Sequence, residues 1–162
     1  GTVGLMMAKI LNVKDKKSLK SAIDLGIAMQ LTNISRDIIE DSKSNRFYIS
    51  HNFNSIKQTL RIADLFYESS FASIKKIPLS FRFSILVARR VYRKIGYNIL
   101  SKKTIESYNN SGKIYVTNFG KIIQTFLSLY DLARLLLIQD EGHHRYEEHQ
   151  IISEEVNLDE RF

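Results

Sequence analysis

The chain has 162 residues, a length that fits one domain with its own hydrophobic core. It contains no cysteine, which excludes disulfides and thiolate-bound metals. Its apolar runs are far shorter than the roughly 20 residues that span a bilayer, so no transmembrane segment is expected. The formal net charge of +7 favours anionic partners in general. The basic residues are spread rather than grouped, so a nucleic-acid partner is not expected.

A single proline, seven glycines and many Leu, Ile, Lys and Ala residues predict an all-α fold. The apolar start of the chain has neither a helix cap nor the basic flank of a signal peptide, so we expect it to begin inside a helix of a longer protein. Apolar spacing and end signals predict helices over residues 3–11, about 18–41, 55–75, 81–100 and 119–138. We expect one domain over residues 1–138, followed by a loosely ordered acidic tail over residues 139–162.

Polar residues and the proline mark the boundaries between these helices. Asp15 or Ser18 is expected to cap the second helix, and Asn118 the last. Residues 46–50 are predicted to form a short extended or turn segment, and the stretch that contains Pro78 is predicted to end the third helix. Between the fourth and last helices we expect a helical turn and then a polar loop over residues 108–112.

A polar seam runs along the helix that is predicted to end at Asp41. At 100° per residue, Asn33, Asp37 and Asp41 all fall within about 60° of Gln30. Apolar residues cover most of the remaining circumference, and a helix that is apolar nearly all round is normally buried. Because unpaired buried charges are costly, a row of oxygen donors that ends in Asp-x-x-x-Asp predicts a hard cation between Asp37 and Asp41.

Five segments of the chain resemble phytoene synthases of the squalene/phytoene synthase family, in that family's order and at its spacing. They are GTVGLMM at residues 1–7, DLGIAMQLTNISRDIIED at 24–41, NRFYIS at 45–50, ARRVYRKIG at 88–96, and the V-T-x-x-x-K pattern of Val116, Thr117 and Lys121. The second segment is the most specific of the five. The resemblance covers residues 1–138 and leaves only the acidic tail outside.

This resemblance implies an all-α isoprenoid synthase helical bundle, incomplete at its N-terminus. In the family, two Asp-x-x-x-Asp motifs on facing helices hold Mg²⁺, for which Mn²⁺ can substitute, and the ions bind the diphosphates of two prenyl donors. Asp37 and Asp41 match the second motif, as metal-binding and catalytic residues, and Tyr92 matches a further catalytic position. The matches to substrate-binding positions are Gln30, Asn33, Arg36, Arg46 and Tyr48.

The resemblance also implies a reaction. Phytoene synthases join two geranylgeranyl diphosphates head to head through a cyclopropyl diphosphate, a step of carotenoid biosynthesis. The alternatives are a squalene or dehydrosqualene synthase that uses farnesyl diphosphate, and a non-catalytic relative that acts in assembly. The sequence does not distinguish a C20 donor from a C15 donor. Because the product is insoluble in water, we expect a cytoplasmic protein with peripheral membrane contact.

The chain departs from the family pattern at two points. The family's first acidic motif lies upstream of the GTVGLMM segment, and no later Asp-x-x-x-Asp pair on an apolar helix replaces it. Ser50 stands where the family usually has proline. We therefore expect these residues to be the C-terminal part of the enzyme and to be inactive alone.

Other residues have expected roles in packing or in solvent. Arg36 lies about 100° from the seam, so it either binds phosphate or makes a structural ion pair. The apolar wall of the prenyl cavity is expected from Ile23, Ile27, Leu31, Ile34 and Phe47. A solvated basic face is expected from Arg89, Arg90, Arg93 and Lys94. Lys113 and Lys121 are expected to pair with nearby acids or with solvent.

Overall fold

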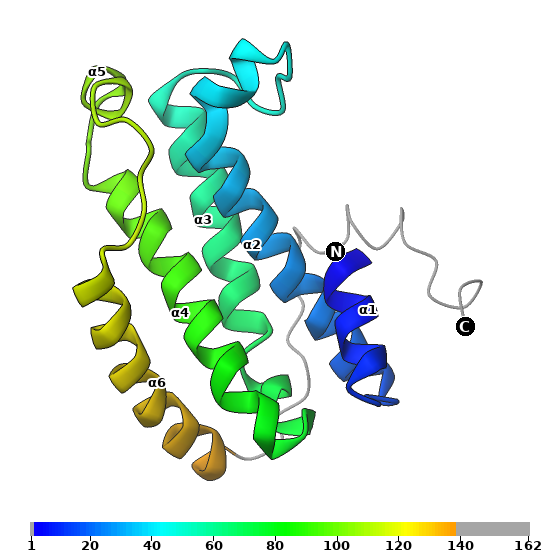
Figure 1. Cartoon of the computed structure of the whole chain (residues 1–162). Helices are drawn as coiled ribbons and strands as arrows, with labels where there is room; N and C mark the ends of the chain where they lie inside the picture. The colour runs from blue at the N-terminus through cyan, green and yellow to red at the C-terminus, as the bar shows by residue number, and fades with distance from the viewer. Residues whose placement is uncertain (1, 139–162) are drawn as a thin grey trace.

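A computed structural model describes residues 2–138; the predicted tail over residues 139–162 lies outside the described residues, as does Gly1. The described part is all-α and contains no strand. Figure 1 shows its helices, which are α1 (Thr2–Ile10), α2 (Lys16–Lys43), α3 (Phe53–Ser69), the 3₁₀-helix η1 (Ala72–Lys76), α4 (Leu79–Leu100), α5 (Ile105–Asn109) and α6 (Asn118–Leu137). None of these helices is long and apolar enough to cross a membrane.

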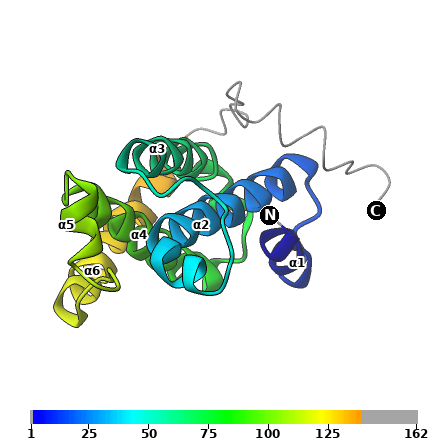
Figure 2. The same cartoon turned by 90° about the horizontal axis from the view of Figure 1, so that it is seen from above.

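Helix α2 lies at the centre of the arrangement and contacts α1, α3, α4 and η1. Seen from above, it separates α1 on one side from α3 and α4 on the other (Figure 2). Ala28 of α2 is fully buried against Ala63 and Phe66 of α3, and Ile38 near the end of α2 packs with Ile56 of α3. Helix α6 lies along α4, on the far side of the molecule from α1.

Helix α1 packs on α2 at unusually short range. A Cβ atom placed on Gly4 would lie 2.0 Å from the carbonyl oxygen of Ala22 on α2. Only glycine therefore lets the two backbones come this close. The helix ends at Ile10. Asn12 follows with a φ of 59° in the left-handed region, and the amide of the buried Val13 donates to the carbonyl of Ala8 in a Schellman turn.

Most predicted helix boundaries agree with the structure to within two residues, and the exceptions have local or tertiary causes. Asp15 caps α2, and this was one of the two residues, Asp15 or Ser18, that the sequence offered for the cap. The cap of α6 is Thr117 and not Asn118, because the Thr117 hydroxyl accepts the amide of Gly120. The single helix predicted over residues 55–75 is wrong: α3 ends at Ser69, and η1 follows.

The break after α3 has a tertiary cause. The carbonyl of Tyr67 accepts two hydrogen bonds from the buried guanidinium of Arg89, at 3.1 and 2.9 Å. The hydroxyl of Ser70 donates to the same carbonyl. These donors take the place of the backbone amide that would continue the helix. Because Arg89 lies on α4, no local sequence signal reports this contact.

The solvated basic face predicted on α4 is wrong for three of its four members. Burial lowers the pKa of Arg89 to about 10, although the group stays charged at neutral pH. Arg90 makes a two-point ion pair with Asp131 of α6, which is 3% exposed. Arg93 pairs with Asp64 and Glu68 of α3. These three arginines join α4 to its neighbours, so their role is structural.

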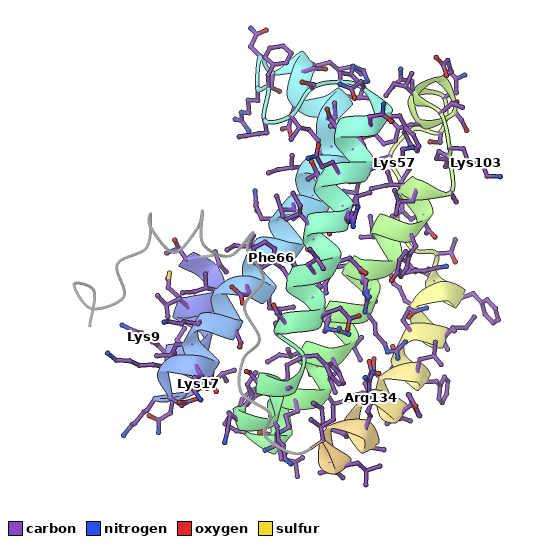
Figure 3. All side chains as sticks on the ribbon, turned by 180° about the vertical axis from the view of Figure 1, so that it is seen from behind. Lys9, Lys17, Lys57, Phe66, Lys103 and Arg134 are labelled. Carbon is purple, nitrogen blue, oxygen red and sulfur yellow. The ribbon has the colours of Figure 1, made fainter. Side chains whose placement is uncertain are left out.

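The lysines project from several sides of the molecule (Figure 3). Lys9 and Lys17 lie at the end formed by α1 and the start of α2, whereas Lys57 and Lys103 lie at the opposite end. This distribution agrees with the expectation of spread rather than striped charge.

Candidate functional site

The end of α2 positions the acidic pair beside Arg46. Asn45 adopts a left-handed conformation, with φ of 54°. The amide of Arg46 then donates to the carbonyl of Asp41 at 2.8 Å, and the amide of Asn45 donates to Ser42 at 3.1 Å. These two bonds form a Schellman turn. The turn reverses the chain just after the Asp-x-x-x-Asp pair, so residues 46–48 return toward the last turn of α2.

Asp37 is held by two cations. Arg36 donates to both of its carboxylate oxygens, at 2.8 and 2.7 Å, and Lys113 lies 3.6 Å from Oδ1. Partial burial alone would raise the pKa of the Asp37 carboxyl, but the hydrogen bonds from Arg36 and the charge of Lys113 hold it below its usual value. Asp37 is therefore ionised at neutral pH, as a metal ligand must be.

Residues from α5 and from the loop after it complete this environment, and the sequence did not predict their position there. Lys113 bridges Asp37 and Glu40, with a 2.7 Å bond to Glu40. Its pairing with acids was expected, but its position beside Asp37 was not. Tyr108 was predicted in a polar loop, and this is wrong: it is buried in α5, and its hydroxyl donates to the carbonyls of Ser35 and Arg36.

A mostly apolar cavity of about 340 Å³ lies between α1, α2, η1 and α4. Gln30 and Asn33 of α2 line it, and so does Tyr92 of α4, so three of the predicted site residues share one cavity. The predicted wall residues are not those that line it. The apolar lining comes instead from Leu25, Met29, Met7, Ile74, Ile77 and Ile85.

The prediction of the wall residues was wrong because the cavity adjoins a narrower face of α2 than the apolar pattern suggests. Ile23 is buried against α1, and Ile27 and Leu31 pack toward neighbouring helices. Ile34 and Phe47 line a separate, small hollow at the end of α2. A helix that is apolar nearly all round does not reveal by itself which of its faces adjoins a cavity.

That small hollow brings together the remaining predicted residues. Asp41, Arg46 and Tyr48 line it, and so does His51. Arg46 and Tyr48 are exposed, and Asp41 is half-buried. The structure therefore distributes the predicted site along α2: the amides Gln30 and Asn33 adjoin the apolar cavity, Asp37 follows them, and Asp41 lies beside Arg46.

The donor atoms on this face fit a hard cation. Asn33, Asp37 and Asp41 follow one another at intervals of four residues on one helix, so their oxygens lie on one face. The Oδ1 atom of Asn33 is buried and has no hydrogen-bond partner among the described residues, which leaves an acceptor available. Mg²⁺ prefers such oxygen donors and keeps water or phosphate in its remaining positions.

The described residues do not supply a larger carboxylate cluster. Within residues 2–138, no group of three or more His, Cys, Asp or Glu side chains is arranged to hold a metal ion. The two carboxylates and the amide of α2 are thus a partial ligand set.

Comparisons with known proteins point in one direction. A sequence model described as squalene/phytoene synthase matches residues 1–55, which include both Asp37 and Asp41. The chain is 36% identical to the 15-cis-phytoene synthase of Enterobacter agglomerans over 121 residues, which are 62% of this chain and 41% of that protein. It is 33% identical to the 15-cis-phytoene synthase of Paracoccus sp. (strain N81106 / MBIC 01143) over 152 residues, which are 83% of this chain and 49% of that protein.

A plant protein extends the range of similarity. Phytoene synthase 1, chloroplastic, of Zea mays is 26% identical over 163 residues, which are 84% of this chain and 39% of that protein. No solved structure gives a significant match. The chain spans about half the length of these curated relatives, or less. With both acidic residues inside the matched region and an all-α fold around them, the chain belongs to the squalene/phytoene synthase family.

Proposed function

We propose that the full-length protein is a phytoene synthase that requires Mg²⁺, or Mn²⁺ in its place. It would condense two geranylgeranyl diphosphates to phytoene through a cyclopropyl diphosphate, in carotenoid biosynthesis. The observation that carries the proposal is the row of oxygen donors Asn33, Asp37 and Asp41, which continues the line of an apolar cavity along one helix. A prenyl diphosphate has the same division into an anionic head and an apolar chain.

The side chains of α2 and the loop after it would act on the diphosphate. Asp37 and Asp41, with the side-chain oxygen Oδ1 of Asn33, would hold Mg²⁺. The ion would stabilise the negative charge of a departing diphosphate. Arg36 and Lys113, already at Asp37, can donate charge-assisted hydrogen bonds to phosphate oxygens. Arg46 and Tyr48 are held nearby by the turn at Asn45.

The cavity would protect the reactive hydrocarbon. A prenyl carbocation reacts with water, so it needs an apolar enclosure with few nucleophiles. Leu25 and Met29 supply such a surface on α2. Gln30 and Tyr92 add polar atoms at the cavity, where they can orient the chain without being strong nucleophiles.

Substitution of the acidic pair tests this proposal. Asp37→Asn and Asp41→Asn in the full-length protein should each lower phytoene formation from geranylgeranyl diphosphate and Mg²⁺ by about a hundredfold or more. Losses of this size accompany removal of one electrostatic stabiliser from an active site. Product is measured by chromatography, and circular dichroism should show unchanged helicity.

Asp64→Asn is the matched control, because Asp64 is an acid of α3 that pairs with Arg93 away from the acidic pair. It should keep the activity of the wild type. Full turnover by either Asp37→Asn or Asp41→Asn would exclude the assigned site.

A further inference from the structure

The apolar cavity is elongated along α2. The α2 residues that line it run from Ser18 to Asn33, a separation of about 22 Å at 1.5 Å per residue. Its volume of about 340 Å³ is within the range of small-ligand pockets. One end of this line continues toward Asp37 and Asp41. A chain whose diphosphate lies at those residues would extend toward the start of α2.

The two ends of the cavity differ in exposure. Toward the acidic pair the lining residue Gln30 is exposed; Val3 and Met7 are also exposed, and they lie on α1, which packs on α2 at Ala22. At the other end Ser21 and Ile74 are buried. The lining is therefore exposed at Gln30, on the side of the acidic pair, and buried where the start of α2 meets η1.

Two serines form part of the buried end. The hydroxyl groups of Ser21 and Ser73 share a hydrogen bond of 2.7 Å between α2 and η1. Ser18 and Ser70 also line the cavity, and their hydroxyls donate to Asp15 and to the carbonyl of Tyr67. Because these hydroxyls are engaged within the protein, their contribution to an apolar ligand is their small size.

We propose that Ser21 and Ser73 set the length of the prenyl chain that the cavity accepts. This inference rests on the proposed function, because it takes the cavity to be a prenyl site. The small pair leaves room for the last isoprene unit of a geranylgeranyl chain, and a larger side chain at either position occupies that room. The protein then accepts a farnesyl chain, which is one unit shorter, and rejects the geranylgeranyl chain.

Binding of unreactive analogues tests the proposal independently of turnover. Farnesyl and geranylgeranyl thiolodiphosphates are titrated with Mg²⁺ into the full-length protein and into its Ser21→Leu and Ser73→Leu variants. We expect each leucine to weaken binding of the geranylgeranyl analogue at least about tenfold, since a single methylene changes selectivity by about 10- to 200-fold in a tight pocket. Binding of the farnesyl analogue should change by less than about threefold. Two positions on separate elements guard against misfolding of one variant.

Ser21→Ala and Ser73→Ala are the matched controls, because they remove the hydrogen bond without filling the cavity. They should keep the preference of the wild type. If both leucine variants keep the wild-type helicity and melting temperature yet bind the two analogues as the wild type does, the inference is wrong.

Product analysis separates this inference from the proposed function. With each natural diphosphate as substrate, the leucine variants should raise the ratio of C30 to C40 hydrocarbon. A changed binding preference in a protein that makes neither hydrocarbon would refute the proposed function and retain the length assignment. Phytoene formation with an unchanged ratio and unchanged binding would refute the length assignment alone.

Discussion

At the scale of single residues, Asp37 combines a structural and a proposed catalytic role. Its two oxygens bind Arg36, and Lys113 lies close to one of them. The same carboxylate is proposed to hold Mg²⁺. Because its neighbours are cations that can also bind phosphate, the proposed site would place the negative charge of Asp37 at the metal and the positive charge around it at the diphosphate.

The pairing with Arg36 should be visible in the pH dependence of stability. The pKa of Asp37 is below its usual value in the folded chain, so the pair stabilises the fold above about pH 4 and this stabilisation is lost as the pH falls through the folded pKa. Arg36→Met removes the hydrogen bonds that lower the pKa. The free energy of unfolding in urea should therefore fall less between about pH 7 and about pH 3 in Arg36→Met than in the wild type. Arg61→Met, at an exposed arginine of α3, should follow the wild type; an equal fall in Arg36→Met would contradict the argument.

Local sequence predicted some of these residues and not others. The spacing of Gln30 and Asn33 placed them correctly on one face of a helix, because helical periodicity is a local property. The contact of Lys113 with Asp37 joins α2 to the loop after α5, and nothing near either residue in the sequence encodes it. The wrong prediction for Tyr108 has the same explanation. Its polar neighbours in the sequence predicted a loop, whereas its side chain is buried against α2, which is distant in the sequence.

At the scale of elements, α1 depends on one glycine. Gly4 lies against the carbonyl of Ala22, and backbone on both sides leaves no flexible side chain to yield. Helix ends and caps were largely predictable, because Asp15 and Pro78 act locally. The close approach of α1 to α2 was not predictable, because a glycine within a helix does not indicate which segment packs against it.

Gly4→Ala tests this contact. Helix propensity alone would stabilise α1 by about 1 kcal/mol, whereas overpacking against a backbone typically costs about 1–3 kcal/mol or more. With a Cβ at 2.0 Å from an oxygen, we expect the clash to exceed the gain in propensity and the free energy of unfolding to fall by about 1–2 kcal/mol. Urea unfolding measures the change. Val3→Ala, at the exposed neighbouring position, is the control and should be near neutral; a Gly4→Ala variant as stable as the wild type would show that α1 is not held at this distance.

At the scale of the whole molecule, α6 presents an apolar face opposite the face that packs on α4. Ser128, Asp131 and Leu135 are buried, while Phe119, Phe126, Tyr130 and Leu137 are 72, 68, 66 and 85% exposed. A helix that is apolar nearly all round is normally covered. The sequence predicted the helix, but only the packing of α4 decides which side of it stays open.

This face should make the 162-residue chain self-associate, as contiguous exposed apolar patches commonly do. Sedimentation velocity over a range of concentrations should show species larger than a monomer. Phe126→Gln with Tyr130→Gln should shift the distribution toward the monomer. Lys121→Gln, also exposed on α6 but outside this face, should leave the distribution unchanged. A wild-type chain that stays monomeric at all concentrations would refute the expectation.

Because α2 is uninterrupted, it fixes the distance between the acidic pair and the buried end of the cavity. From Ser21 to Asp37 it spans sixteen residues without interruption, or about 24 Å. Inserting one residue in this span would turn Asp37 by about 100° away from the line of the cavity. Inserting seven would nearly restore the direction but lengthen the span by about 10 Å. Insertions and deletions in this segment are therefore not expected to yield a protein that accepts a prenyl chain of a different length. A change of side-chain size, with the number of residues in α2 unchanged, can do so.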